Sequence, residues 1–191
     1  MSAANIRSYL SVLLHGLSPR SERERLAKER ALQELELLDA PMDEDAGPIH
    51  VTASAFIVSP RGILLHEHKS LGLWLQPGGH IEPGEWPQDA ALREGEEETG
   101  LVVSHPKSGP QLIRIDVHPG PRGHTHLDVG YLLLAEGSAP TPPSGESQHV
   151  AWFALADAVE QAADDLKDFL PTLFLAARAV GVSIPEHSSS A

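Results

Sequence analysis

One helix in the middle of the chain is marked at both ends by residues that start and stop helices. Pro87 suits the first turn, where its missing N–H would have no helical partner, and Gly100 suits the position just past the end. Together they predict a helix from Pro87 to Thr99. Residues 78–101 around it hold six glutamates. Because like charges three and four residues apart on a helix repel, this run either faces water or surrounds a cation.

Segments with strand character lie on both sides of this helix, separated by Pro, Gly and Ser. The expected strands are 50–59, 63–66, 73–75, 101–104, 112–117, 126–135 and 150–153, and the expected C-terminal helices are 155–163 and 166–180. Strands that precede and follow a central helix, with more helix at the end, predict an α/β fold of the α+β, mixed-sheet kind, with layers packed on both faces of the sheet.

The amino-terminal residues carry a separate helical pattern. Apolar residues at helical spacing predict helices over 5–17 and about 21–38, and Ser18-Pro19 separates them. The apolar stripe expected on the second helix is Leu26, Leu32, Leu35 and Leu38. These two helices are expected to cover part of the body or a partner subunit.

The domain organisation follows from these patterns. Residues 1–42 are expected to form the helical extension and residues 43–184 the main domain. Residues 185–191 are expected to be a disordered tail.

Composition excludes several classes of function. The 191 residues include no cysteine, which excludes disulfides, thiolate zinc sites and a cysteine nucleophile, and favours a cytoplasmic location. The formal net charge of −13 disfavours binding to nucleic acid or to an anionic membrane surface. No apolar run approaches the roughly 20 residues of a membrane span, and the start of the chain lacks the features of a secretory signal. An anionic substrate would therefore need a cation to neutralise it.

Three of the glutamates share one face of the predicted helix. Glu94, Glu97 and Glu98 stand at positions i, i+3 and i+4, which aligns their carboxylates. Mg²⁺ prefers oxygen ligands of this kind. Gly78 and Gly79 have no side chains, so their main-chain carbonyls can come close to the same face. From this spacing alone, a solvated acidic surface stays an equal alternative.

The complete pattern is more specific than its parts. It follows G-x5-E-x7-R-E-U-x-E-E-x-G-U, where U is a bulky apolar residue, and the matched positions are Gly79, Glu85, Arg93, Glu94, Glu97, Glu98, Gly100 and Leu101. This pattern resembles the signature of the Nudix hydrolase family. The motif covers 23 residues, and the strand order around it is similar to the family's α/β/α sandwich.

The resemblance implies a role for each matched position. The implied catalytic residues are Glu85, Arg93, Glu94, Glu97 and Glu98. Glu94, Glu97 and Glu98 would bind Mg²⁺, for which Mn²⁺ could substitute, and the Gly78 carbonyl would be a further ligand. Glu85 and Arg93 would hold the loop and the helix in register.

One motif position departs from the family pattern. Gly95 stands where the family has a bulky apolar residue, and a glycine there costs about 1 kcal/mol of helix stability relative to alanine. The missing side chain leaves a shallow groove through which a strand or a large side chain can approach closely. No metal ligand is altered, so the departure concerns local packing and not activity.

The resemblance also implies a reaction, the hydrolysis of a diphosphate linkage in a nucleotide substrate. The reaction builds negative charge on phosphoryl oxygens, which bound Mg²⁺ would neutralise while acidifying a water molecule. The general base is open between a motif glutamate and Glu146. Substrate selectivity lies outside the motif, so nucleoside triphosphates, ADP-ribose, dinucleoside polyphosphates and nucleotide sugars all stay open. Family members are often dimers, so a homodimer is a further expectation.

Two alternatives use the same fold. One is a non-catalytic nucleotide-binding sensor, which the intact glutamates disfavour. The other is an isomerase such as isopentenyl diphosphate isomerase. The absence of cysteine disfavours it, because the resembling enzymes use a cysteine in proton transfer.

Histidines are the second unusual feature, with eleven in the chain. His124, His126 and Asp128 alternate along an expected strand, so their side chains share one face. These groups could bind a second metal, line a polar cleft that contacts the substrate, or lie at the surface without a role. His80, inside the motif, is placed to meet phosphate. The residues expected to bind substrate are His80, His126 and Asp128.

Overall fold

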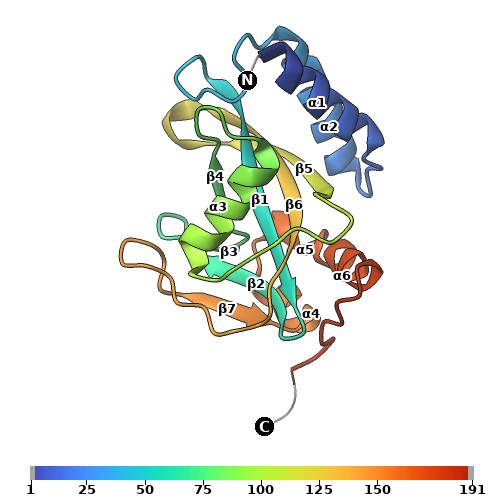
Figure 1. The fold of residues 1–191 in the computed structure, drawn as a ribbon, viewed down its shortest axis with the longest axis vertical. Coiled ribbons are helices and arrows are strands. Elements are labelled where there is room, and N and C mark those ends of the chain that lie inside the picture. The colour runs from blue at the N-terminus through green and yellow to red at the C-terminus, as the bar shows by residue number, and fades with distance from the viewer. Residues whose placement is uncertain (1–2, 189–191) are drawn as a thin grey trace. The chain divides into compact units, whose positions relative to one another are not determined.

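The computed structural model describes residues 3–188 (Figure 1). The helices are α1 (Ala3–Gly16), α2 (Glu22–Leu37), α3 (Pro87–Thr99), the 3₁₀ turn η1 (Pro121–Gly123), α4 (Leu155–Gln161), α5 (Asp164–Lys167) and α6 (Leu170–Ala179). The strands are β1 (Ile49–Ser59), β2 (Gly62–Glu67), β3 (Trp74–Leu75), β4 (Gly78–His80), β5 (Leu112–Pro119), β6 (Thr125–Leu134) and β7 (Val150–Phe153). The predicted mixed α/β class with amino-terminal helices is confirmed.

The strands form one sheet in the order β3-β2-β1-β6-β5, with β4 paired to β1 and β7 paired to β2. The chain also divides into two compact units, and four elements, β1, β4, α3 and β6, have residues in both. Within the described residues, the first unit holds 3–54, 79–91 and 112–131, and the second holds 55–78, 92–111 and 132–188.

In the first unit, α1 and α2 lie side by side and pack within their own chain (Figure 1). Ile6, Leu10 and Leu14 of α1 are buried in a core that includes residues of β1, β5 and β6. The leucines of α1 are thus used inside the subunit. The expected stripe on α2 was wrong at Leu26, which is 52% exposed. The buried face instead follows Ala27, Ala31 and Leu35, whose spacing of four residues aligns them and whose two small side chains permit close packing.

An ion pair fastens α2 to β5. Arg23 donates from Nε to Oδ1 of Asp116 at 2.9 Å and from Nη2 to Oδ2 at 3.0 Å. His118 Nδ1 also lies 3.2 Å from Oδ2. Burial alone would raise the pKa of Asp116, but the hydrogen bonds from His118 and Arg23 outweigh it and hold this pKa well below its ordinary value. The charged carboxylate therefore ties the helical extension to the sheet.

In the second unit, the expected strand at 101–104 was wrong except for one residue. Gly100 ends α3 in the left-handed region, with φ at 67°, and its N–H donates to the Glu96 carbonyl at 2.8 Å. Leu101 N–H then donates to Thr99 Oγ1, so this backbone is bonded to the helix end. Only Ser104 forms an isolated bridge, to Leu134 of β6.

The C-terminal helices also differ from expectation. The helix expected at 166–180 is divided into α5 and α6, because Pro171 lacks an N–H and occupies the first turn of a new helix. The expected tail falls partly on residues 189–191, which lie outside the described residues. Before them, the carbonyls of Pro185 and Glu186 accept hydrogen bonds from the N–H groups of Leu155 and Ala156. No helix within residues 3–188 has the length and apolar character needed to cross a bilayer.

Candidate functional site

The glutamates of α3 lie where the sequence predicts them, and the helix has the expected bounds. Arg93 Nη1 donates to Oε1 of Glu94 at 2.8 Å and to Oε2 of Glu97 at 3.1 Å. The side chains of Glu94 and Glu98 are 14% and 17% exposed, whereas that of Glu97 is 59% exposed. One nitrogen of the Arg93 guanidinium thus bonds both the sheltered carboxylate of Glu94 and the exposed carboxylate of Glu97. Glu85 lies in the loop before α3, where its Oε2 accepts a hydrogen bond from the Glu82 N–H at 3.0 Å.

Glu98 is the most perturbed of these groups. Its Oε2 accepts a hydrogen bond from the Gly78 N–H at 3.0 Å, and His66 Nδ1 lies 3.7 Å from the same oxygen. Burial raises the pKa of Glu98 to about 8, and the nearby charges of Glu94 and Glu146 add to this effect. At neutral pH and without a cation, this carboxyl group therefore holds a proton.

These features fit a hard divalent cation. The donors are carboxylate oxygens on one helix face, and Glu98 is sheltered among like charges that a bound cation would relieve. The Gly78 N–H faces Glu98, which brings the main chain of Gly78 to this carboxylate. Its carbonyl stays a predicted ligand.

Metal binding here should depend on pH. The pKa of Glu98 in the folded protein is about 8, above the ordinary 4.5, so between these values the folded protein holds a proton that the unfolded chain has lost. At low pH this proton increases the free energy of unfolding of the metal-free protein. That increase is lost as the pH rises toward 8. Since Mg²⁺ needs the charged carboxylate, its affinity should rise up to about tenfold per pH unit in this window and level off above it.

Calorimetric titrations with Mg²⁺ in buffers of different ionisation heat would measure the number of protons released when Mg²⁺ binds. Glu98→Gln should abolish this proton release. Equal Mg²⁺ affinity and no proton release at pH 6 and pH 8 would contradict the assignment.

The second group of polar residues belongs to the first unit. One ligand atom from each of His50, His80 and His126 lies within 4.8 Å of the other two. The ring centroid of His50 lies 5.1 Å from that of His80 and 4.9 Å from that of His126. Burial lowers the pKa of His126 to about 4, and the positive charge of neighbouring histidines acts in the same direction. The structure thus brings together the predicted His80 and His126 and adds His50.

Asp128 has a different environment from these histidines. Its Oδ1 accepts a hydrogen bond from Thr52 Oγ1 at 3.0 Å, and its Oδ2 accepts one from Ser54 Oγ at 2.6 Å. The carboxylate is almost fully buried, so both of its oxygens bond inside the fold.

His50 was missed in the sequence, although a signal was present. His50, Thr52 and Ser54 alternate with Val51 and Ala53 at the start of β1, and this is the same alternation that singled out His126 and Asp128. Two strands with polar residues on alternate positions predict a shared polar face where they pair.

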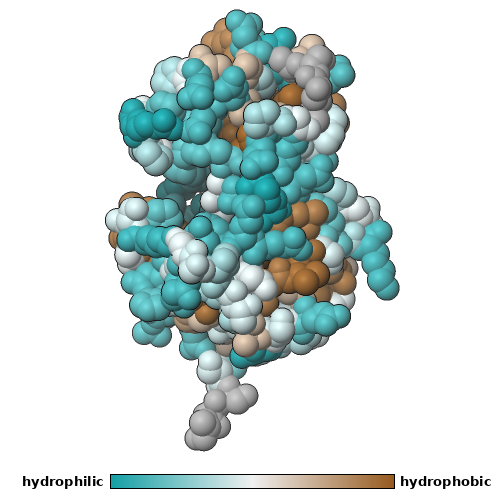
Figure 2. Space-filling view, turned by 60° about the vertical axis from the view of Figure 1, so that its left-hand side comes forward, coloured by the Kyte–Doolittle hydropathy of each residue, from teal (hydrophilic) through white to brown (hydrophobic). Residues whose placement is uncertain are grey.

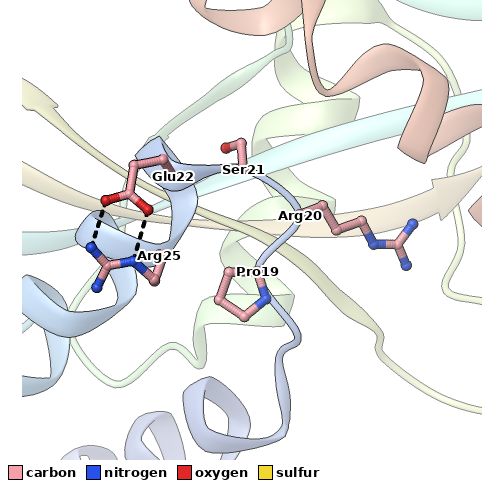
Figure 3. A pocket seen from close by; sticks show the side chains of 5 residues that line it. All are labelled: Pro19, Arg20, Ser21, Glu22 and Arg25. Atoms are coloured by element: carbon pink, nitrogen blue, oxygen red, sulfur yellow. Dashed lines mark hydrogen bonds and ion pairs between the residues drawn. The ribbon is translucent and has the colours of Figure 1, made fainter.

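A surface pocket lies at the turn between α1 and α2 (Figure 3). Its lining residues are Pro19, Arg20, Ser21, Glu22 and Arg25. Arg25 Nη2 lies 2.6 Å from Oε1 of Glu22, and both side chains are well exposed. None of the predicted site residues lines this pocket. The face of the molecule in Figure 2 is mostly hydrophilic, with smaller apolar patches.

Known proteins resemble this chain in sequence. A family model described as "NUDIX domain" matches residues 48–173. The chain is 30% identical over 120 residues to a protein from Lactococcus lactis described as "Probable DHNTP pyrophosphohydrolase", covering 57% of this chain and 70% of that protein. It is also 30% identical over 142 residues to an isopentenyl-diphosphate Delta-isomerase from Streptomyces avermitilis, covering 69% and 71% of the two chains.

The fold is also similar to solved structures. A hydrolase of the NUDIX family from Clostridium perfringens matches with a TM-score of 0.56 and 29% identity, over 69% of this chain and 97% of that one.

Proposed function

Since the chain belongs to the NUDIX family, we propose that it is a Mg²⁺-dependent hydrolase that cleaves a diphosphate linkage in a nucleotide. The observation that carries the proposal is the carboxylate cluster of α3. Glu94, Glu97 and Glu98 lie on one helix face, and Glu98 is sheltered beside the Gly78 main chain. The predicted class, an enzyme that hydrolyses a pyrophosphate bond, is confirmed at the level of the family by its pyrophosphohydrolase relatives.

In the proposed reaction, the bound cation would neutralise the phosphoryl oxygens and acidify a water molecule. The residues of the chain position these groups. Arg93 orients Glu94 and Glu97, and the Gly78 N–H orients Glu98. Catalysis then needs a base for the attacking water. Glu146 is a candidate because its charge acts on Glu98, which places it near the carboxylate cluster. A motif glutamate stays the alternative.

The other predicted site residues stay proposals. Glu85 would hold the loop before α3, and the Gly78 carbonyl would complete the metal ligands. Substrate contact stays the sequence prediction for His80, His126 and Asp128, although both oxygens of Asp128 accept hydrogen bonds from Thr52 and Ser54 inside the fold. A nucleotide is the proposed small-molecule partner. A homodimer, a cytoplasmic location and the domain boundaries at 42 and 184 also stay predictions.

The isomerase relatives favour a second candidate, isomerisation of an isoprenoid diphosphate. The chain has no cysteine, which the resembling isomerases are expected to use for proton transfer. Hydrolysis is therefore the better-supported reaction. A sensor without activity is the third possibility, and the three intact glutamates argue against it.

A screen with Mg²⁺ would test the proposal against nucleoside triphosphates, ADP-ribose, dinucleoside polyphosphates and nucleotide sugars. Added pyrophosphatase or phosphatase would convert the pyrophosphate or the phosphomonoester products into inorganic phosphate, which is the readout. Isopentenyl diphosphate isomerisation would be assayed in parallel. Each assay would use the wild type, Glu97→Gln and Glu96→Gln. Glu96 is a matched control because it is an exposed glutamate on the same helix at an unconstrained motif position.

Turnover of one nucleotide class that Glu97→Gln loses and Glu96→Gln retains would support the hydrolase and identify the substrate class. Isomerisation without hydrolysis would overturn the proposal in favour of the isomerase. Nucleotide binding without turnover would overturn it in favour of the sensor.

A further inference from the structure

Three histidines from three strands converge in the first unit. His50 lies on β1, His80 at the end of β4 and His126 on β6. One ligand atom from each lies within 4.8 Å of the other two. A tetrahedral Zn²⁺ with bonds of about 2.0–2.1 Å needs ligand nitrogens roughly 3.4 Å apart. The ligand atoms would therefore have to move closer together by up to about 1.4 Å to close around an ion.

The histidine of β1 is buried with little hydrogen bonding. His50 is 0% exposed, and neither Nδ1 nor Nε2 has a hydrogen bond of normal geometry among residues 3–188. Burial and the neighbouring His80 and His124 lower the pKa of His50, and they outweigh the nearby Gly47 backbone, which acts to raise this pKa. His126 Nε2 is likewise buried without a partner among residues 3–188. Leaving such a group unsatisfied destabilises the fold. A nitrogen of His50 that faces the other two rings therefore has a lone pair that a metal ion could bind.

We propose that His50, His80 and His126 form a binding site for one divalent transition-metal ion of the class that prefers imidazole, with Zn²⁺ as its representative. This inference does not depend on the proposed hydrolysis. Imidazole nitrogens suit Zn²⁺, Cu²⁺ and Ni²⁺, whereas carboxylate oxygens suit Mg²⁺. The protein thus carries two donor sets of different chemistry, nitrogen atoms here and oxygen atoms on α3. Three protein ligands leave a fourth position for water or an added ligand.

The surroundings of the three rings support a metal site. His80 Nε2 lies 3.5 Å from Oε2 of Glu44, so a carboxylate already stands beside one ligand ring. The ring centroid of His118 lies 5.3 Å from that of His126, and His118 Nδ1 contacts Asp116. A carboxylate beside a ligand histidine commonly orients the ring that binds a metal, and Glu44 is placed to do this for His80. The strands fix the ligands to a rigid scaffold.

A direct role in substrate binding is the competing explanation for His80 and His126. It accounts for the partly exposed His80, which is 40% exposed at its side chain. It does not account for His50, because a fully buried ring cannot contact a substrate without a rearrangement of the strand.

The test is Zn²⁺ titration of the full chain, freed of any histidine tag and stripped with a chelator. A chromophoric chelator would report competition, and an excess of Mg²⁺ would keep the carboxylate site occupied. Co²⁺ in place of Zn²⁺ would report tetrahedral coordination through its visible absorption. The variants are His50→Gln, His80→Gln, Glu97→Gln and the control His15→Gln, an exposed histidine of α1.

The wild type should bind one Zn²⁺ per chain. His50→Gln and His80→Gln should each weaken this binding about 100-fold or more, beyond the roughly 10–100-fold expected for an outer residue. His15→Gln and Glu97→Gln should bind Zn²⁺ as the wild type does. Because His80 is partly exposed, its variant keeps the test valid if His50→Gln fails to fold.

Two results would overturn the inference. One is that the wild type binds no Zn²⁺ in excess Mg²⁺. If His80→Gln then also raises the KM for a nucleotide, substrate binding explains His80 in place of a metal. The other is Zn²⁺ binding that Glu97→Gln loses and the histidine variants retain.

Discussion

Glu98→Gln is expected to slow hydrolysis of the cognate nucleotide by about 100- to 1000-fold at saturating Mg²⁺, the effect of losing one group that stabilises charge in a transition state. The change is conservative for the metal-free protein. Glu98 has a pKa of about 8, so it is protonated at pH 7, and glutamine has nearly the same shape and can still accept the Gly78 hydrogen bond. The loss should therefore come from the cation and not from the fold.

Two measurements separate these causes. The thermal unfolding midpoint without Mg²⁺ should be the same in Glu98→Gln and the wild type, while the shift produced by adding Mg²⁺ should shrink. Glu96→Gln should keep wild-type turnover. A Glu98→Gln protein with full activity would remove Glu98 from the metal ligands, whereas a large loss of stability without Mg²⁺ would assign it a structural role.

The sequence predicted the part of the site that lies on one element. Pro87 and Gly100 mark the ends of α3, and the helical repeat then places Glu94, Glu97 and Glu98 on one face without further information. The pairing of Arg93 with Glu97 also follows from their spacing of four residues. Local rules determine these positions, so one sequence was sufficient.

Features that depend on how strands pair could not be predicted in this way. His50 and His126 are 76 positions apart, and only the neighbouring places of β1 and β6 in the sheet bring them together. The buried environment of Glu98 likewise depends on β4, a strand of three residues that the sequence did not indicate. The burial of Ala27 in place of Leu26 was also decided by packing against the sheet, which outweighed the larger apolar surface of leucine.

The departure at Gly95 has a packing explanation. A Cβ added there would lie 3.3 Å from both Ala55 Cβ and Ile57 Cδ1, and 3.5 Å from Leu133 Cδ1. The first two residues belong to β1 and the third to β6, and all three are buried in the core of the second unit. The strands therefore occupy the space that a bulky residue fills in the family pattern. The close approach of these strands to α3 agrees with the expectation from the sequence that Gly95 lets a strand approach the helix.

Gly95→Leu, which restores the family pattern, should consequently destabilise this protein. Leucine would add a branched side chain at a position where even the first carbon is in tight contact, and overpacking of this kind costs about 1–3 kcal/mol. Urea unfolding should show a lower midpoint than in the wild type, with a similar dependence on urea concentration.

Gly95→Ala provides the graded control. It gains about 1 kcal/mol of helix propensity, and its single carbon meets one atom at the flexible end of Ile57 and one on the Cβ of Ala55, which cannot rotate away. The gain and the tight contact act in opposite directions, so the alanine variant should lie within about 1 kcal/mol of the wild type. A leucine variant at least as stable as the wild type would show that the helix and the two strands can separate, and the close packing at Gly95 would then not be the reason for the glycine.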